Sequence, residues 1–446
     1  MKATTSMSVI ACAGAAFGFA GAAAADTQQA GISADEARAL VSEMLAEREQ
    51  RSSLLQMDNT RSTVDIGGAV QFRYIANFGD DGVDANDDFN QAVGGNAFAA
   101  RDDYENGFQF GNAQIWFEGE VGDGFGYYVR GNFVKGGQGE FTLEDAYITY
   151  DFGNNWMLKA GQFKMNFSRE ELVDDFYQLA VDRSLVNEVF GADRTEGVML
   201  KYQDDNWRAS ASLNDGYRGA NTQFNNNSQF AFGGGDSDFS VTARGEYKGA
   251  GTWDQFRDFT SMPGSEFAWL VGGAFHYETG DPANREEYDG IGWTVDVSFE
   301  GDGWNAFAAY VGLNADDEPA PGTDRNITNH GFVAQGGFFI PDTDWELFGR
   351  YDLIIDEGID AGASDIGDGE FNTLTFGANY YIHGHAAKLT LDVQWSLNEA
   401  SESASLVTAA GFDGTAGSIG GFPELGYLGD DDENEVAIRG QFQLMF

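Results

Sequence analysis

The feature that most constrains this chain is a series of about sixteen short segments in which apolar and polar side chains alternate. Strict alternation over several residues indicates β-strands with one face in an apolar environment. Each segment is close to the ten residues that a tilted strand needs to cross a membrane. The candidates lie at about 63–74, 108–121, 125–135, 140–152, 156–165, 196–203, 206–214, 238–248, 266–277, 290–299, 304–313, 329–340, 344–355, 370–382, 386–398 and 434–446.

The connections between these segments alternate in length. Short ones are expected at 122–124, 153–155, 204–206, 301–303, 341–344 and 383–385, and long ones at 79–107, 166–195, 215–237, 278–289, 314–328, 356–369 and 399–433. Short turns at one end and long loops at the other are typical of a transmembrane antiparallel β-barrel in an outer membrane. Two connections break the rhythm, because 136–139 is short where a long loop is due and 249–265 is long where a turn is due.

Tryptophans support the membrane interpretation independently. Four of them begin a candidate strand straight after a short turn: Trp156, Trp207, Trp304 and Trp345. Amphipathic rings gathered at one end of the hairpins form the aromatic girdle of a membrane barrel at the lipid–water interface. A soluble β-sandwich gives tryptophan no reason to follow every second turn.

The final segment predicts how the barrel closes. Apolar residues from Val436 to Phe446 share one face, polar residues share the other, and the chain ends on Phe446. This arrangement resembles the C-terminal signal of bacterial outer-membrane proteins, which implies the barrel-insertion machinery as a partner. The strand must also pair with the first one, because an open edge in lipid leaves backbone groups without hydrogen bonds.

The first sixty residues differ from the rest. Residues 1–25 have a positive start, an apolar stretch and an A-x-A site before Asp26, which predicts a signal peptide and an exported protein. Residues 26–60 contain the capping-box pair Ser33 and Glu36 and an uneven apolar stripe, which predict a short periplasmic helix. It could lie against the barrel, form an oligomerising coiled coil or tether the cell wall. The only cysteine, Cys12, lies in the signal peptide, so no disulfide is expected.

Composition is compatible with one barrel domain over residues 61–446. The formal charge is −47, yet 42% of the residues are hydrophobic and 60 are glycine. A membrane barrel reconciles these values, because only alternate strand residues face lipid. No linker divides residues 63–446, and no nucleic-acid partner is expected of so acidic a chain.

Strand parity places several cations inside the barrel. The lipid-facing aromatics fix one face of each strand, so the opposite face carries a basic wall made of Arg73, Arg130, Arg350 and Arg439. An arginine facing lipid at mid-depth would cost about 2–4 kcal/mol, so avoidance of lipid alone would also place them inward. Two interpretations therefore remain open, a functional basic wall and solvated filler.

The long segment after the fifth strand carries the most informative residues. Its runs Gly161–Lys164, Asn166–Glu171 and Asp182–Ser184 resemble the phosphate-selective porin O/P family of sixteen-stranded bacterial outer-membrane porins. The resemblance implies that this segment folds inward as a constriction loop. Its charged candidates are Arg169, Glu170, Glu171, Asp174, Asp175 and Arg183. We expect the acidic loop residues to face the basic wall across the lumen, where close-set charges select ions. The acidic excess of the loop argues against phosphate selectivity.

These observations predict an outer-membrane porin for passive diffusion of small hydrophilic solutes, with anions such as phosphate among the candidates. A homotrimer in contact with outer-membrane lipid and lipopolysaccharide is expected. The alternative is a structural barrel that anchors the envelope through its N-terminal helix. Four scattered histidines and no nucleophile–base pair on adjacent strands predict no enzyme, no metal site and no cofactor.

Overall fold

The computed structural model describes residues 62–79, 104–134, 141–221, 227–228, 230, 235–280, 288–317, 325–360, 365–398 and 435–446. The chain divides into two units, residues 1–60 and 61–446. The predicted signal peptide and N-terminal helix lie outside the described residues.

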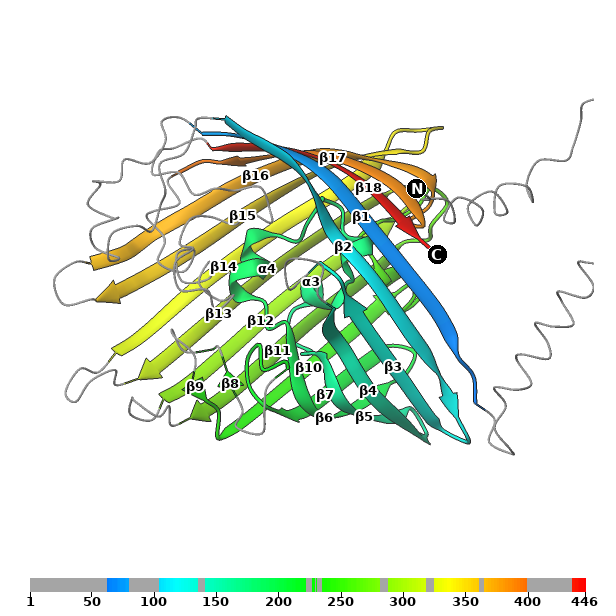
Figure 1. Ribbon diagram of the computed structural model, residues 1–446, viewed down its shortest axis with the longest axis vertical. Helices are drawn as coiled ribbons and strands as arrows, with labels where there is room; N and C mark the ends of the chain where they lie inside the picture. The colour runs from blue at the N-terminus through cyan, green and yellow to red at the C-terminus, as the bar shows by residue number, and fades with distance from the viewer. Residues whose placement is uncertain are drawn as a thin grey trace, which may run out of the picture. The chain divides into compact units, whose positions relative to one another are not determined.

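The second unit is a closed antiparallel barrel of sixteen described strands (Figure 1). Each strand pairs with its neighbours in chain order, and the sixteen-stranded architecture expected from the alternation is confirmed. The strands are β1 (Asp65–Phe78), β2 (Tyr104–Val121), β3 (Phe125–Asn132), β4 (Thr142–Gly153), β5 (Trp156–Lys164), β6 (Arg194–Gln203), β7 (Trp207–Asn214), β10 (Phe239–Ala250), β11 (Ala268–Gly280), β12 (Tyr288–Gly301), β13 (Trp304–Asp317), β14 (Arg325–Phe339), β15 (Trp345–Asp360), β16 (Asp365–His383), β17 (Ala387–Ser396) and β18 (Val436–Met445).

The barrel closes between its first and last strands. β1 and β18 pair in register from Ala69 opposite Met445 to Phe78 opposite Val436. The last residue continues this ladder, because Phe446 and Gly68 exchange two backbone hydrogen bonds of 2.9 Å. The closing edge is therefore paired along a ladder from Gly68 to Phe78, which meets the need for backbone hydrogen bonds in lipid.

The tryptophans form a belt at the short-turn end of the barrel. Trp156, Trp207, Trp304 and Trp345 are the first residues of their strands, and between 40% and 55% of each side chain is exposed. Three of them pack on a tyrosine of the next strand with ring centroids 4.7–5.0 Å apart. The outer surface between the belt and the long loops is therefore apolar and aromatic.

The tight turn between β4 and β5 follows from its residue types. Gly153, Asn154 and Asn155 have φ angles of 73°, 53° and 72°. Glycine and asparagine tolerate this left-handed region better than other residues. The turn therefore sets the register in which Trp156 begins β5.

Two connections fold inward instead of remaining at the rim. Residues 165–193, between β5 and β6, contain α3 (Arg169–Leu172), a 3₁₀ turn η1 (Asp175–Tyr177) and α4 (Leu185–Phe190), which are visible within the ring of strands in Figure 1. The connection between β10 and β11 contains η2 (Gln255–Arg257), and a small hairpin of β8 (Asn227–Ser228) and β9 (Gly235–Asp236) lies outside the barrel sheet. None of the described helices is long and apolar enough to span a membrane.

Local sequence explains where the loop helices begin. Ser168 precedes α3 and its side chain accepts a hydrogen bond from the Glu171 amide. Ser184 precedes α4 and accepts one from the Asn187 amide at 2.9 Å. Serine at the N-cap satisfies amides that a short helix would otherwise leave free.

Candidate functional site: an inward loop between two charged cavities

We call residues 165–193 the constriction loop. Its apolar side chains pack on the inner face of the wall made by β13–β16, and together they form the main hydrophobic cluster of the described residues. α4 contributes Leu185, Val186, Val189 and Phe190, and the wall contributes Phe307, Val311, Val333, Phe348, Ile354 and Phe371. Burying each large side chain is worth about 1.5–3 kcal/mol, so the loop is held firmly against this half of the barrel.

A glycine in the wall makes this packing possible. A Cβ atom on Gly331 of β14 would lie 2.6 Å from Val186 Cγ1 and 2.7 Å from Phe190 Cδ2. Real Cβ atoms do not come so close to neighbours. The missing side chain therefore provides the space into which α4 fits.

The unusually long connection between β10 and β11 supports the constriction loop from the short-turn side. The Phe259 amide donates a 3.2 Å hydrogen bond to the Tyr177 carbonyl. Arg169, 4% exposed, donates to the carbonyl of Phe256 at 2.8 Å and to Ser298 Oγ at 2.8 Å. Arg169 is therefore buried between the two inward segments, and burial lowers its pKa.

A second support comes from the segment after β7, on the long-loop side. Arg218 Nε donates to the Gly191 carbonyl at 2.9 Å, and its Nη2 donates to the Glu188 carbonyl at 2.5 Å. These carbonyls lie at the C-terminal end of α4, where orphan carbonyl groups attract a cation. Tyr217 packs edge-on against Phe167 with centroids 5.9 Å apart.

Three arginines of the predicted basic wall converge on one loop residue, Asp182. Arg73 Nη1 lies 2.5 Å from Asp182 Oδ2, and Arg439 Nη1 lies 3.3 Å from the same oxygen. Arg350 Nη1 donates to the Asp182 carbonyl at 2.9 Å. Arg439 also holds Asp392 with two bonds of 2.8 Å, and Asp392 in turn accepts from the Val181 amide at 2.9 Å. These arginines join the loop to the wall.

The fourth wall arginine makes a second junction. Arg130 Nη1 and Lys164 Nζ each lie 3.0 Å from Asp174 Oδ1 of the loop. Arg130 also contacts Asp145 Oδ2 through Nη2 at 2.7 Å. Burial alone would raise the pKa of Asp174, but Arg130 and then Lys164 hold that pKa well below its usual range. Asp174 is therefore ionised at any physiological pH.

The remaining predicted loop residues interact mainly within the loop. Glu170 accepts from Ser184 N at 2.7 Å and from its Oγ at 2.6 Å, and burial raises the Glu170 pKa. Arg183 forms an ion pair with Asp175 and lowers the pKa of that carboxyl to about 2, although burial alone would raise it. Glu171 accepts from Asn187 Nδ2 at 2.7 Å.

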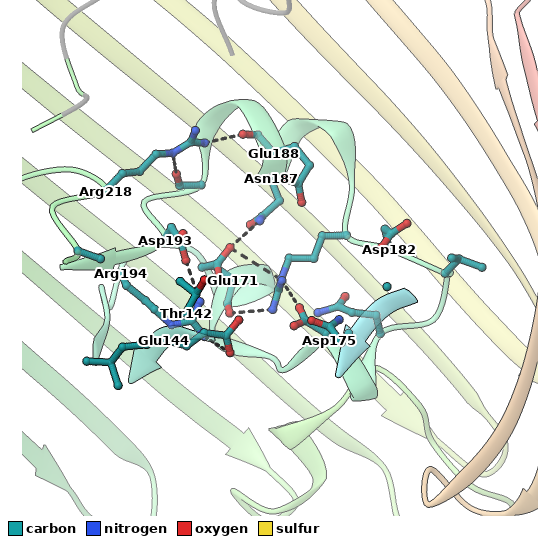
Figure 2. Close-up of a pocket in the computed structure, with 18 of the residues that line it drawn as sticks. Thr142, Glu144, Glu171, Asp175, Asp182, Asn187, Glu188, Asp193, Arg194 and Arg218 are labelled. Atoms are coloured by element: carbon teal, nitrogen blue, oxygen red, sulfur yellow. Dashed lines mark hydrogen bonds and ion pairs between the residues drawn. The ribbon is translucent and has the colours of Figure 1, made fainter. Parts of the chain in front are cut away.

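Asp174 and Asp182 thus meet the basic wall in direct ion pairs, and not across the lumen as expected for the acidic loop residues. Segment 171–178 lies between two cavities and contributes residues to both. The outer cavity has a volume of about 490 Å³, and Figure 2 shows residues that line it. Thr142 and Arg194, the first residues of β4 and β6, are among them, so the cavity lies toward the strand ends opposite the short turns. Its lining holds four arginines and six carboxylates: Arg73, Arg183, Arg194, Arg218, Glu144, Glu171, Asp175, Asp182, Glu188 and Asp193.

The inner cavity, of about 440 Å³, lies toward the short turns and has the opposite charge balance. Its lining holds five cations and three carboxylates: Arg130, Lys159, Lys164, Lys201, Arg257, Glu118, Asp145 and Asp174. Lys159 of β5 and Lys201 of β6 have no carboxylate within ion-pair distance among the described residues. The lumen is therefore acidic on one side of the loop and basic on the other.

Sequence reasoning missed part of this arrangement. No pattern marks Asp182 as the point where three arginines meet, because that depends on the path of the loop. Strand parity relative to Trp156 and Tyr202 places Lys159 and Lys201 on the lumen side, but no pattern shows that they lack a carboxylate partner. Within the described residues, no group of three or more histidine, cysteine or acidic side chains is placed to hold a metal ion.

A closed sixteen-stranded barrel that is narrowed by the loop after its fifth strand has the architecture of bacterial outer-membrane porins. Residues 86–253 match the family of phosphate-selective porins O and P. This match confirms the resemblance drawn from the runs within residues 161–184.

Solved structures agree on the fold. The anion-selective porin from Comamonas acidovorans is 12% identical with a TM-score of 0.56, and the match covers 86% of this chain and 100% of that one. The channel DcaP of Acinetobacter baumannii is 13% identical with a TM-score of 0.54, covering 86% and 97%. OmpT of Vibrio cholerae is 10% identical with a TM-score of 0.50, covering 87% and 99%. No curated protein matches the sequence.

Proposed function

We propose that this porin passes small hydrophilic solutes by diffusion and favours anions at its inner cavity. The observation that carries the proposal is the pair Lys159 and Lys201, which lie on neighbouring strands without a carboxylate partner among the described residues. Lys201 is opposite Met157 in the register, two residues from Lys159. Such diagonal neighbours lie about 7–8 Å apart, close enough for one anion to interact with both.

The ion pairs of the loop explain why these two lysines matter more than the arginines. Arg73, Arg130 and Arg439 each bind a loop carboxylate directly, so much of their field is cancelled at short range. The electrostatic potential of Lys159 and Lys201 is not cancelled by a nearby carboxylate among the described residues. It acts strongly on permeating ions because the cavity has low-dielectric walls. An anion that passes the loop therefore meets two amines that no described carboxylate pairs, and these amines carry positive charge when protonated.

The similar proteins support this proposal. The Comamonas porin is described as anion-selective, and the matched family is described as phosphate-selective. We extend anion preference to this chain without naming the anion, because its outer cavity is acidic.

The envelope context follows the same reasoning. We propose that residues 1–25 direct export, that the strand ending in Phe446 is read by the insertion machinery, and that three copies assemble among outer-membrane lipid and lipopolysaccharide. The exposed aromatic face that ends at Phe446, 75% exposed, suits contact with lipid. Residues 26–60 would lie in the periplasm.

Reversal potentials in planar bilayers test the selectivity. With a KCl gradient across the reconstituted protein, we expect anion preference that falls when Lys159→Gln and Lys201→Gln are combined. Arg208→Gln is the matched control, because this neighbouring cation is already paired with Glu246 at 3.3 Å. Cation preference in the unaltered channel would contradict the proposal, as would equal effects of the control and the double variant.

A further inference from the structure

The inner cavity combines its two lysines with a pair of tyrosines. Tyr128 of β3 and Tyr147 of β4 lie directly opposite each other in the register. Their rings are stacked, with centroids 5.3 Å apart and an interplanar angle of 21°. Lys159 Nζ lies 3.9 Å from the centroid of the Tyr147 ring. The cation and the two rings therefore form one continuous surface on the wall of the cavity.

The tyrosine hydroxyls add polar groups to this surface. Neither Tyr128 nor Tyr147 hydrogen-bonds through its hydroxyl to another residue in the described part of the chain. Tyrosines that are packed inside a protein usually satisfy that hydroxyl with a protein partner. Both side chains are only half-buried and line the cavity, so both hydroxyls are available to a solute.

Two further aromatic side chains line the cavity. Phe176 of the constriction loop and Trp116 of β2 both line it, with ring centroids 6.5 Å apart. The volume of about 440 Å³ falls within the usual range for small-molecule sites, about 300–1,000 Å³. A flat solute in the cavity would meet both aromatic rings and the two lysines of the lining.

We propose that the inner cavity is a binding site for aromatic carboxylates, a class of solute that crosses the pore through it. The ring would stack on Tyr128 and Tyr147, and the carboxylate would be bound by Lys159 and Lys201. This inference rests on the proposed anion preference and deepens it by naming the solute class. A tetrahedral anion such as phosphate would gain nothing from the rings and would need several convergent N–H donors at one point.

Block of the chloride current by two carboxylates of similar size tests the site. Benzoate presents a flat π face, whereas cyclohexanecarboxylate has the same charge without one. In the reconstituted full-length protein we expect benzoate to block with about two- to tenfold higher affinity, the range that aromatic pairing supports. This comparison uses the unaltered protein and does not depend on whether a variant folds.

Two kinds of substitution separate the contributions. Tyr128→Leu and Tyr147→Leu should remove the benzoate advantage and leave block by cyclohexanecarboxylate unchanged, whereas Lys201→Gln should weaken block by both. Tyr310→Leu is the control, because Tyr310 is on the outer face of β13 and hydrogen-bonds His330.

The outcomes keep the two proposals distinct. Equal block by both carboxylates in an anion-selective channel would overturn the aromatic site and leave anion preference intact. Cation preference in the reversal-potential experiment would overturn the proposed selectivity and this inference together. Benzoate block that persists in both tyrosine variants would also overturn the site.

Discussion

Replacing Asp182 by asparagine should loosen the constriction loop without opening the barrel. The side chain receives Arg73 at 2.5 Å and Arg439 at 3.3 Å on one oxygen. Asparagine keeps the shape and one acceptor but removes the charge, so both charge-assisted contacts weaken. The Arg350 bond to the Asp182 carbonyl and the bidentate Arg439–Asp392 pair remain.

The expected cost follows from these contacts. A hydrogen bond to a charged group contributes about 1.5–3 kcal/mol. Because Asp182 is partly exposed and Arg439 retains Asp392, we take the lower part of that range, about 2 kcal/mol. If the loss falls on the loop alone, the population of the displaced loop rises about 30-fold, since 1.4 kcal/mol corresponds to a factor of ten.

Hydrogen exchange of the loop amides measures this population directly. We expect faster exchange over residues 174–183 in Asp182→Asn and more noise in single-channel currents, with unchanged exchange in β1 and β18. Asp123→Asn, in an exposed short turn, is the matched control. Unchanged loop exchange together with unchanged current noise would refute the view that these pairs hold the loop.

Two further results are expected. Gly331→Val should lower the free energy of unfolding by about 1–3 kcal/mol and alter conductance, because the valine side chain would collide with Val186 and Phe190. Heat-induced unfolding checks this, with Gly245→Val as the control because a Cβ atom there meets open space. Burial raises the pKa of Glu188 to about 8, so its carboxyl is mostly protonated at neutral pH and loses its proton as the pH rises through about 8. The outer cavity then gains negative charge, and cation permeability should rise over that interval in the unaltered channel but not in Glu188→Gln.

The barrel could be predicted from sequence because its determinants are local. Alternation fixes which face of each strand meets lipid, and the tryptophans after short turns mark one interface. Backbone N–H and C=O groups in lipid must be hydrogen-bonded within the protein, so a series of such strands is expected to close into a barrel. The pairing of β1 with β18 follows from the same argument.

The interior of the barrel was less predictable, because it depends on contacts between residues far apart in the chain. The acidic excess of the loop suggests an open field across the lumen, yet Asp174 and Asp182 reach the wall and form ion pairs there. The long connection between β10 and β11 is visible in the sequence as an irregularity. Nothing in its composition shows that it turns inward to meet Tyr177.

These contacts change the role that the wall arginines can have. A cation that is paired at 2.5–3.3 Å with a loop carboxylate holds the loop in place, and its removal should change stability and loop position first. A cation without such a partner acts on the permeating ion. Selectivity should therefore respond more to the two inner lysines than to any of the four wall arginines, although the arginines lie nearer mid-strand. The effect of a charged side chain on selectivity thus depends more on whether it has an ion-pair partner than on where it lies along the pore.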